Sequence, residues 1–533
     1  MKHEVLKVGT VFENDTYYTA NEDLFFALGD ATPATKPEYL SVSPNNLDKI
    51  DTCILLQDKK NIVLDFAGNT LLMQGRVQPI IIDNCENITI KNCVAEFENT
   101  FSMQFEIMEI GDGYVMLKPN SRQNCKIVDG CIVSYGKGWE NDGLSNRFNF
   151  LACFDKQGNP RGQILVVVSH HPNYDKNAPF LPIEYTAEQV GDYIRFNGPV
   201  NENWRVGDYL VEESEPRYRS GINMQNSRNI TIENHRIVNG VGVGLCIIHC
   251  HNISIDRFNM IYDSRSHGIV ANSADAIHSF ACSGYMKIKN SKIENIIDDF
   301  INVHGNYLTV SRVINEKTVE CKTECLGLNI YCNFLDVGDE VAFYKGKTMA
   351  VRESNVIKEK KILDKKTVVF TLEQPIGNLC PGDILENVTG NAELYVNDCE
   401  FLNANSHIRL QTRGKTVFDN CTFDIPICLT GDSNVWFEGN RCLDLTIQNS
   451  RFTTPRAFVE IVPEFEVDDD APFYHENIKL LNNTFLSDVA IRGHNARNIQ
   501  VFGNRNVQGK TLKLELKDCE EIATDNAELI KGE

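Results

Sequence analysis

Short runs of alternating apolar and polar residues recur along most of the chain, and each includes an Asn or Asp. Three examples are "NITIKNC" at 87–93, "NITIENHRI" at 229–237 and "NISIDRF" at 252–258. Similar runs return at 286–293, 393–401, 416–423, 445–452, 478–485 and 499–504. Alternation over four to six residues is typical of half-buried β-strands. Asn suits the bends between them, because it tolerates left-handed backbone angles.

The spacing of these runs predicts a solenoid. Asn229 and Asn252 are 23 residues apart, and later runs keep a similar period. A repeat of about 20–25 residues is also found in leucine-rich repeats, which need a leucine ladder and a helical half. The sequence contains neither. We therefore expect an all-β protein, a right-handed parallel β-helix in which each coil stacks on the next.

Two stretches interrupt the period. They contain short strand-like runs and tight turns, such as "VGDEVAFYKG" at 337–346. We interpret each as a small β-barrel domain inserted into the β-helix. The predicted organisation is an N-terminal cap and first β-helix coils at 1–104, an inserted barrel at 105–218, central coils at 219–305, a second inserted barrel at 306–391 and C-terminal coils at 392–533.

Candidate catalytic chemistry lies in "ADAIHSFACSGYMKIKNSKIENIIDDFINVHG" at 274–305. Asp275 precedes Asp298 by 23 residues, which is about one coil, and Asp299 follows directly. Aligning "HGIVANS" at 267–273 with "DFINVHG" at 299–305 gives a larger offset of 32. We therefore expect an extended turn beginning at Asp275 to carry that residue to the pair.

Three clustered carboxylates repel one another, which keeps at least one of them protonated near neutral pH. A protonated acid beside an ionised carboxylate is what hydrolysis of a glycosidic bond requires. Two alternatives remain for the same residues. Asp is common in solvated turns, and clustered carboxylates also suit a calcium ion.

The composition of the chain excludes some classes of binding partner. The formal net charge is −21 with no basic block, which argues against nucleic acid and against an anionic membrane surface. The 18 cysteines stand in strand-like contexts, as expected of small buried residues. No apolar run reaches the roughly 18 residues of a membrane helix. The first residues show no signal peptide, so we expect a cytoplasmic protein unless the sequence has been trimmed.

The order "ADAIH", then "IDDFINVHG", in a β-helix with barrel insertions resembles glycoside hydrolase family 110. The resemblance implies an exo-acting, inverting α-1,3-galactosidase that removes terminal α-galactose, including that of blood group B antigen. It implies no metal and no other cofactor. It also implies that Asp298 is the general acid and that Asp275 and Asp299 position and deprotonate the attacking water.

Substrate-binding residues are nominated by position. His278, Asn302 and His304 flank the aspartates, Asn223 lies on the equivalent strand two coils earlier, and Arg409 follows the second insertion. The expected partner is a carbohydrate with terminal α-galactose. The exposed sheets of a solenoid are also compatible with a homodimer.

Other functions remain open. The aspartates also resemble those of polygalacturonases, but that family's Gly-His-Gly and Arg-x-Lys stretches are missing at the expected places. An acidic protein is also a poor partner for polyanionic pectin. A pectate-lyase-type eliminase would need calcium and an arginine base. A non-catalytic β-helix carbohydrate-binding protein would not need three carboxylates.

Overall fold

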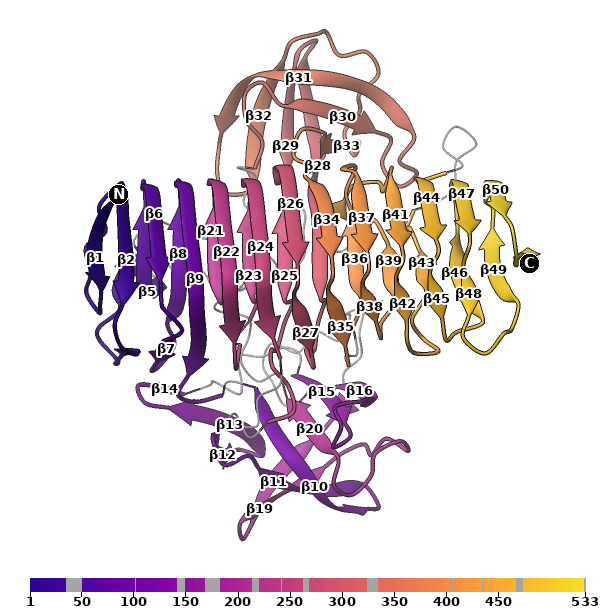
Figure 1. Ribbon diagram of the computed structural model, residues 1–533. Coiled ribbons are helices and arrows are strands. Elements are labelled where there is room, and N and C mark those ends of the chain that lie inside the picture. The colour runs from indigo at the N-terminus through magenta and orange to yellow at the C-terminus, as the bar shows by residue number, and fades with distance from the viewer. Residues whose placement is uncertain are drawn as a thin grey trace.

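The computed structural model describes the chain at residues 1–34, 50–100, 102–140, 149–167, 183–212, 220–240, 242–261, 268–323, 334–403, 406–433, 436–465 and 473–531. Among these residues no helix is long and apolar enough to cross a membrane. The structure is all-β. The two termini lie at opposite ends of a long stack of strands (Figure 1).

Two long parallel sheets form this stack, and the chain passes from one to the other in each repeat. The first sheet includes β9 (Glu86–Phe97), β22 (Arg228–Ile237) and β24 (His251–Met260), which pair in parallel. The second runs through β21 (Ile222–Gln225), β23 (Leu245–Ile248), β25 (Ile277–Phe280), β28 (Ile301–Asn315) and β36 (Ile408–Gln411). This arrangement is consistent with the predicted β-helix.

The alternating runs form strands with their apolar residues buried, as predicted. Ile88, Ile230 and Ile253 lie in register and are buried in one continuous core between the sheets. The preceding residues Asn229 and Asn252 have φ of 56° and 59°, in the left-handed region that Asn tolerates. Their side chains hydrogen-bond from coil to coil, with Asn252 Nδ2 donating to Asn229 Oδ1 at 3.2 Å.

In its described residues, the first interruption of the repeat forms two extra sheets. An eight-stranded sheet, mainly antiparallel, has the order β17-β16-β15-β20-β10-β11-β19-β18. A separate sheet contains three strands. The elements are β10 (Met103–Gly111), β11 (Tyr114–Pro119), β12 (Asn124–Val128), β13 (Cys131–Gly136), β14 (Trp139–Glu140), β15 (Asn149–Phe154), β16 (Pro160–Val167), β17 (Ile183–Glu184), β18 (Thr186–Val190), β19 (Tyr193–Asn197) and β20 (Tyr209–Glu212). Because β17 and β18 are the ends of this order in the described residues, closure into a barrel stays a prediction.

The second interruption forms an antiparallel ring on the other side of the stack (Figure 1). Here β28 pairs with β29 and β33, and the ring continues through β32, β31 and β30. The added strands are β29 (Thr318–Lys322), β30 (Glu340–Tyr344), β31 (Val351–Ile362), β32 (Thr367–Leu372) and β33 (Ile384–Asn387). Strand β28 is shared: its first residues pair with β25 and β36 of the stack, and its later residues belong to the ring.

Candidate active site

Asp275 and Asp299 occupy equivalent positions in consecutive coils. Ile277 pairs with Ile301, an offset of 24, which is also the offset from Asp275 to Asp299. The backbone N–H of Ala276 donates to the Asp299 carbonyl at 2.8 Å. The predicted extended turn at Asp275 is therefore wrong. The longer coil lies before Asp275, since Leu245 pairs with Ile277 at an offset of 32. Asp275 therefore lies beside Asp298 and Asp299 because consecutive coils stack on each other.

The three aspartates form one cluster at the edge where β25 and β28 begin. One carboxylate oxygen of each lies within 4.8 Å of the others. Asp275 and Asp299 are buried, and Asp298 is half-buried. Burial strengthens the repulsion among carboxylates, because the effective dielectric is lower than in water. The cluster therefore favours a state in which at least one of the three carries a proton.

Donors and cations surround Asp299. Ser406 Oγ donates to Asp299 Oδ1 at 2.7 Å, and His407 Nε2 lies 3.3 Å from the same oxygen. Arg409 Nε lies 3.4 Å from Oδ2. Burial alone would lower the pKa of Arg409, but the charge of Asp299 and other nearby anions outweighs it and raises that pKa. Arg409 is therefore a permanent cation beside Asp299.

A chain of hydrogen bonds leads away from Asp275. His278 Nδ1 lies 2.5 Å from Asp275 Oδ2, and His278 Nε2 lies 2.9 Å from His304 Nε2. His304 Nδ1 lies 2.7 Å from the carbonyl oxygen of Gly305. Burial would lower the pKa of His278, but Asp275 and two further carboxylates outweigh it and raise that pKa. For His304, burial together with the charge on His278 lowers the pKa to about 4.

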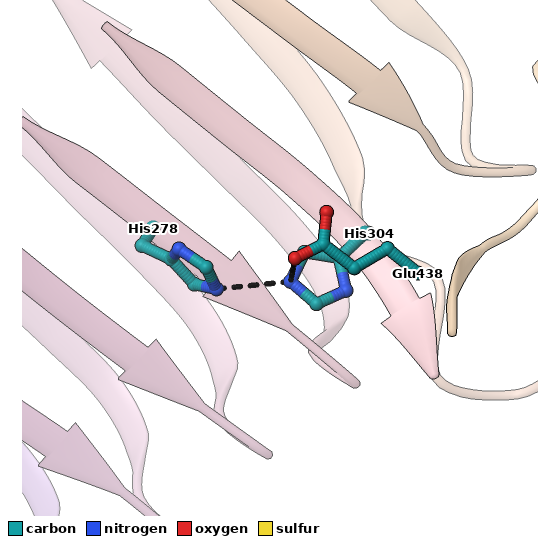
Figure 2. Close-up of side chains that lie close together, drawn as sticks. All are labelled: His278, His304 and Glu438. Carbon is teal, nitrogen blue, oxygen red and sulfur yellow. Dashed lines mark hydrogen bonds and ion pairs between the residues drawn. The ribbon is translucent and has the colours of Figure 1, made fainter. Parts of the chain in front are cut away.

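Glu438 joins the cluster from a distant part of the sequence. It lies in β40 (Glu438–Gly439), which pairs antiparallel with Gly305 and Asn306 of β28. Its Oε1 lies 3.8 Å from His304 Nε2, beside the two imidazoles (Figure 2). Burial would raise the pKa of Glu438, but the positive charges around it lower that pKa, so the carboxyl is ionised near neutral pH.

The predicted binding residues share one row of the second sheet. Successive partners in register are Asn223, Cys246, His278, Asn302 and Arg409, on β21, β23, β25, β28 and β36. These positions alternate with core residues, so their side chains lie on the face opposite the core. His304 is two residues beyond Asn302 on the same face. The structure thus gathers His278, Asn302, His304 and Arg409 beside the aspartates and places Asn223 two strands away.

Asn302 has an unmet polar atom in this site. Its Nδ2 lies 3.5 Å from Glu438 Oε2, while its buried Oδ1 has no hydrogen-bond partner among the described residues. A buried polar atom without a partner is costly, and a bound ligand or water commonly supplies the missing bond. Asn302 is therefore suited to receive a hydroxyl of a polar ligand.

Sequence reasoning missed Glu438, Ser406 and His407. Glu438 stands in "WFEGN", which has no recognisable motif, and it is 136 residues from Asn302. Ser406 precedes its strand by two residues, as Asp275 and Asp299 do, and His407 follows Ser406. That equivalent position was the one available signal. Among the described residues, two groups contain donors close enough to be considered for a metal: the three aspartates, and His278, His304 and Glu438.

Comparison with known proteins adds the family context. The chain is 24% identical over 477 residues to alpha-1,3-galactosidase B of Bacteroides thetaiotaomicron, covering 85% of this chain and 74% of that protein. It is 25% identical to alpha-1,3-galactosidase A of the same organism, over 85% of this chain and 79% of that protein. A Phocaeicola vulgatus alpha-1,3-galactosidase B is 27% identical, over 79% of this chain and 71% of that protein.

The chain is homologous to the alpha-1,3-galactosidases A and B. No family model matches the chain. The first of these similarities covers 85% of the chain. The aspartate cluster therefore stands in a homologue of galactosidases, on the face of the sheet that carries the other polar residues described above.

Proposed function

We propose that the protein is a glycoside hydrolase, an α-galactosidase that removes terminal α-1,3-linked galactose from oligosaccharides or glycoconjugates. The observation that carries the proposal is the cluster of three aspartates within 4.8 Å, in a chain homologous to alpha-1,3-galactosidases. A set of carboxylates in which some are ionised and one is protonated provides an acid and a base at one bond.

The roles follow from the neighbours of each carboxylate. The imidazole of His278 contacts Asp275, and the guanidinium of Arg409 contacts Asp299, so both carboxylates have a basic neighbour. Asp298 is assigned as the general acid, as the resemblance to glycoside hydrolase family 110 implies. Asp298 donates its proton to the glycosidic oxygen as the bond to C1 breaks. Water attacks C1, and Asp275 or Asp299 accepts the proton that the water loses.

The stereochemical outcome is proposed as inversion, on the resemblance to glycoside hydrolase family 110. Inverting enzymes usually separate the two carboxyl groups by about 6.5–9.5 Å, whereas retaining enzymes use about 5–5.5 Å. The closest carboxylate oxygens here lie within 4.8 Å, so the separation alone does not support inversion. The configuration of the first product decides the point.

Proton NMR of the product formed first provides the test. The protein is incubated with α-1,3-galactobiose, blood group B trisaccharide and polygalacturonate, with Asp298→Asn as the control. We expect early β-galactose from the first two substrates and none from the variant. Early α-galactose would contradict inversion while supporting the galactosidase. Release from polygalacturonate alone would favour the polygalacturonase alternative.

One observation bears on the alternatives. Arg409 and His278 are cations that could hold a uronate carboxylate, yet each contacts an aspartate of the cluster. This pairing favours a neutral sugar over an acidic one. A non-catalytic carbohydrate-binding protein would tolerate Asp298→Asn without loss of function, so the same variant separates that reading from catalysis.

The finer architecture is part of the proposal. We infer that the two parallel sheets form a right-handed β-helix, because parallel strand crossovers are right-handed in nearly all known sheets. The insertions at 105–218 and 306–391 are proposed as separate small domains flanked by coils at 1–104, 219–305 and 392–533. A homodimer stays a prediction from the sequence.

A further inference from the structure

Two buried histidines meet in a way that fixes the position of their protons. The Nε2 atoms of His278 and His304 are 2.9 Å apart, and the rings are nearly perpendicular at 87°. Two unprotonated nitrogens at that distance would turn their lone pairs toward each other. One of the two therefore carries a hydrogen and donates it to the other.

The outer contacts decide which histidine is the donor. His304 Nδ1 faces the carbonyl oxygen of Gly305, which only accepts, so Nδ1 carries a hydrogen. On the other side, His278 Nδ1 faces the carboxylate of Asp275 and donates to it. Both Nδ1 atoms therefore carry a hydrogen, so the hydrogen between the two Nε2 atoms makes one of the rings an imidazolium. The Asp275 carboxylate lies 2.5 Å from His278, whereas the Glu438 carboxylate lies 3.8 Å from His304, which places the positive charge on His278. Neutral His304 then accepts from His278 through its bare Nε2.

A metal ion fits this geometry less well than a proton. A tetrahedral zinc bound to both Nε2 atoms at about 2.0–2.1 Å would hold them about 3.3 Å apart. The observed 2.9 Å is a hydrogen-bond distance. Glu438, which would be the third ligand, has its nearer oxygen 3.8 Å from His304 Nε2, so it balances charge at a longer range.

We propose that His278 is a positioning residue: an imidazolium, held by neutral His304, that keeps Asp275 ionised and fixes the orientation of its carboxylate toward the attacking water. This inference rests on the proposed function for its catalytic consequence, whereas the charge of His278 stands on the contacts alone. The charged groups around His278 are Asp275, Asp299 and Glu438. Arg409 lies two strands away in the same row, because His278 pairs with Asn302 and Asn302 pairs with Arg409. These anions keep the imidazolium stable although it is buried.

For catalysis, this arrangement should let the enzyme stay active at lower pH. A cation within hydrogen-bond distance lowers the pKa of a carboxyl group by about 1–3 units. The base should therefore stay ionised in mildly acidic solution. Replacing His278 by a neutral donor should move the acidic limb of the kcat/KM profile upward by about 1–3 pH units.

Two variants separate charge from hydrogen bonding. His278→Gln keeps a donor without the charge, and His278→Lys restores a cation. We expect the acidic limb to move upward in His278→Gln and to return toward the wild-type position in His278→Lys. An unchanged limb in His278→Gln would overturn the proposal. Equal shifts in both variants would also overturn it, because they would indicate a merely structural role.

A second measurement needs neither activity nor a folded variant. Nitrogen-15 NMR of wild-type protein labelled at histidine reports the protonation of each ring. We expect one buried ring protonated at both nitrogens at pH 7, and a second, coupled to it through Nε2, protonated at Nδ1 alone. Two neutral rings, or one equivalent of bound zinc in the purified protein, would overturn the assignment. If the sugars are not hydrolysed but this signature is found, the proposed function fails and the charge of His278 stands.

Discussion

Asp275 and Asp299 are vertical neighbours, linked by the hydrogen bond of 2.8 Å from the Ala276 N–H to the Asp299 carbonyl. Both precede a strand of the second sheet by two residues, so the fold repeats the same carboxylate at the same place in consecutive coils. Stacking alone therefore produces the close contact between like charges, and the cations His278 and Arg409 balance it on either side.

Removing the charge of Asp275 tests its role as a base. Asp275→Asn should lower kcat by about 10²–10⁴-fold, the usual contribution of a positioned acid or base. A control is Asp208→Asn, at a buried aspartate in the first insertion that accepts from the backbone of Arg205. That variant should hydrolyse the substrate at the wild-type rate. Equal losses in both variants would point to unfolding.

Arg409 should matter for stability as well as for activity. Arg409→Met leaves buried Asp299 without this cation, and breaking a buried pair costs about 3–5 kcal/mol. Arg492→Met is a matched control in the same row of the sheet, because its pair with Glu515 is more exposed, with 51% of the Arg492 side chain accessible. Exposed pairs contribute about 0–1 kcal/mol. Urea unfolding of both variants measures the difference, and similar losses would refute the buried pair's importance.

Acid should destabilise the fold through three buried histidines. Burial lowers the pKa of His235 and of His304 to about 4 and that of His475 to about 3. Below their ordinary value of about 6.5 the unfolded chain binds more protons than the folded one, so stability is full above that pH and falls as the pH drops toward 4. Together they contribute a slope of up to about 4 kcal/mol per pH unit.

Urea unfolding between pH 7 and pH 5 measures this slope. His235 stacks beside Phe258, and its ring nitrogens have no hydrogen-bond partner among the described residues. His235→Leu removes one titrating group and should reduce the contribution of the three histidines by about a third. A slope that does not change would show that His235 is not neutral in the folded protein.

The aromatic stack in the C-terminal coils should be a second source of stability. The ring of Phe452 lies 4.4 Å from that of Phe485 and 5.0 Å from that of Phe423. Phe452→Ala should cost about 3–5 kcal/mol, because it leaves a cavity between coils. Phe502→Ala changes a partly exposed ring and should cost far less. Urea unfolding compares the two, and equal costs would contradict a tightly packed stack.

Local pattern predicted those parts of the protein that depend on neighbours in sequence or one coil away. The alternating runs gave the buried isoleucines, and Asn229 and Asn252 adopt the left-handed angles expected of them. The nominated row from Asn223 to Arg409 could be predicted because the period of the repeat fixes the register.

Contacts between distant segments could not be predicted. Glu438 reaches the site because β40 pairs antiparallel with β28, against the direction of every coil around it. No repeat predicts such a reversal. The prediction for Asp275 was wrong for a related reason. A long coil shifts the period, and the sequence alignment assigned its extra residues to the wrong side of β25.

Strand β28 makes the second insertion inseparable from the site. It runs unbroken from Ile301 to Asn315, so Asn302 and His304 lie on the same continuous strand as residues that form part of the antiparallel ring. Deleting this ring to obtain a smaller protein would leave the C-terminal end of β28 without its strand partners. The deletion would disturb the two side chains although neither was cut away, so the ring holds the candidate site in shape.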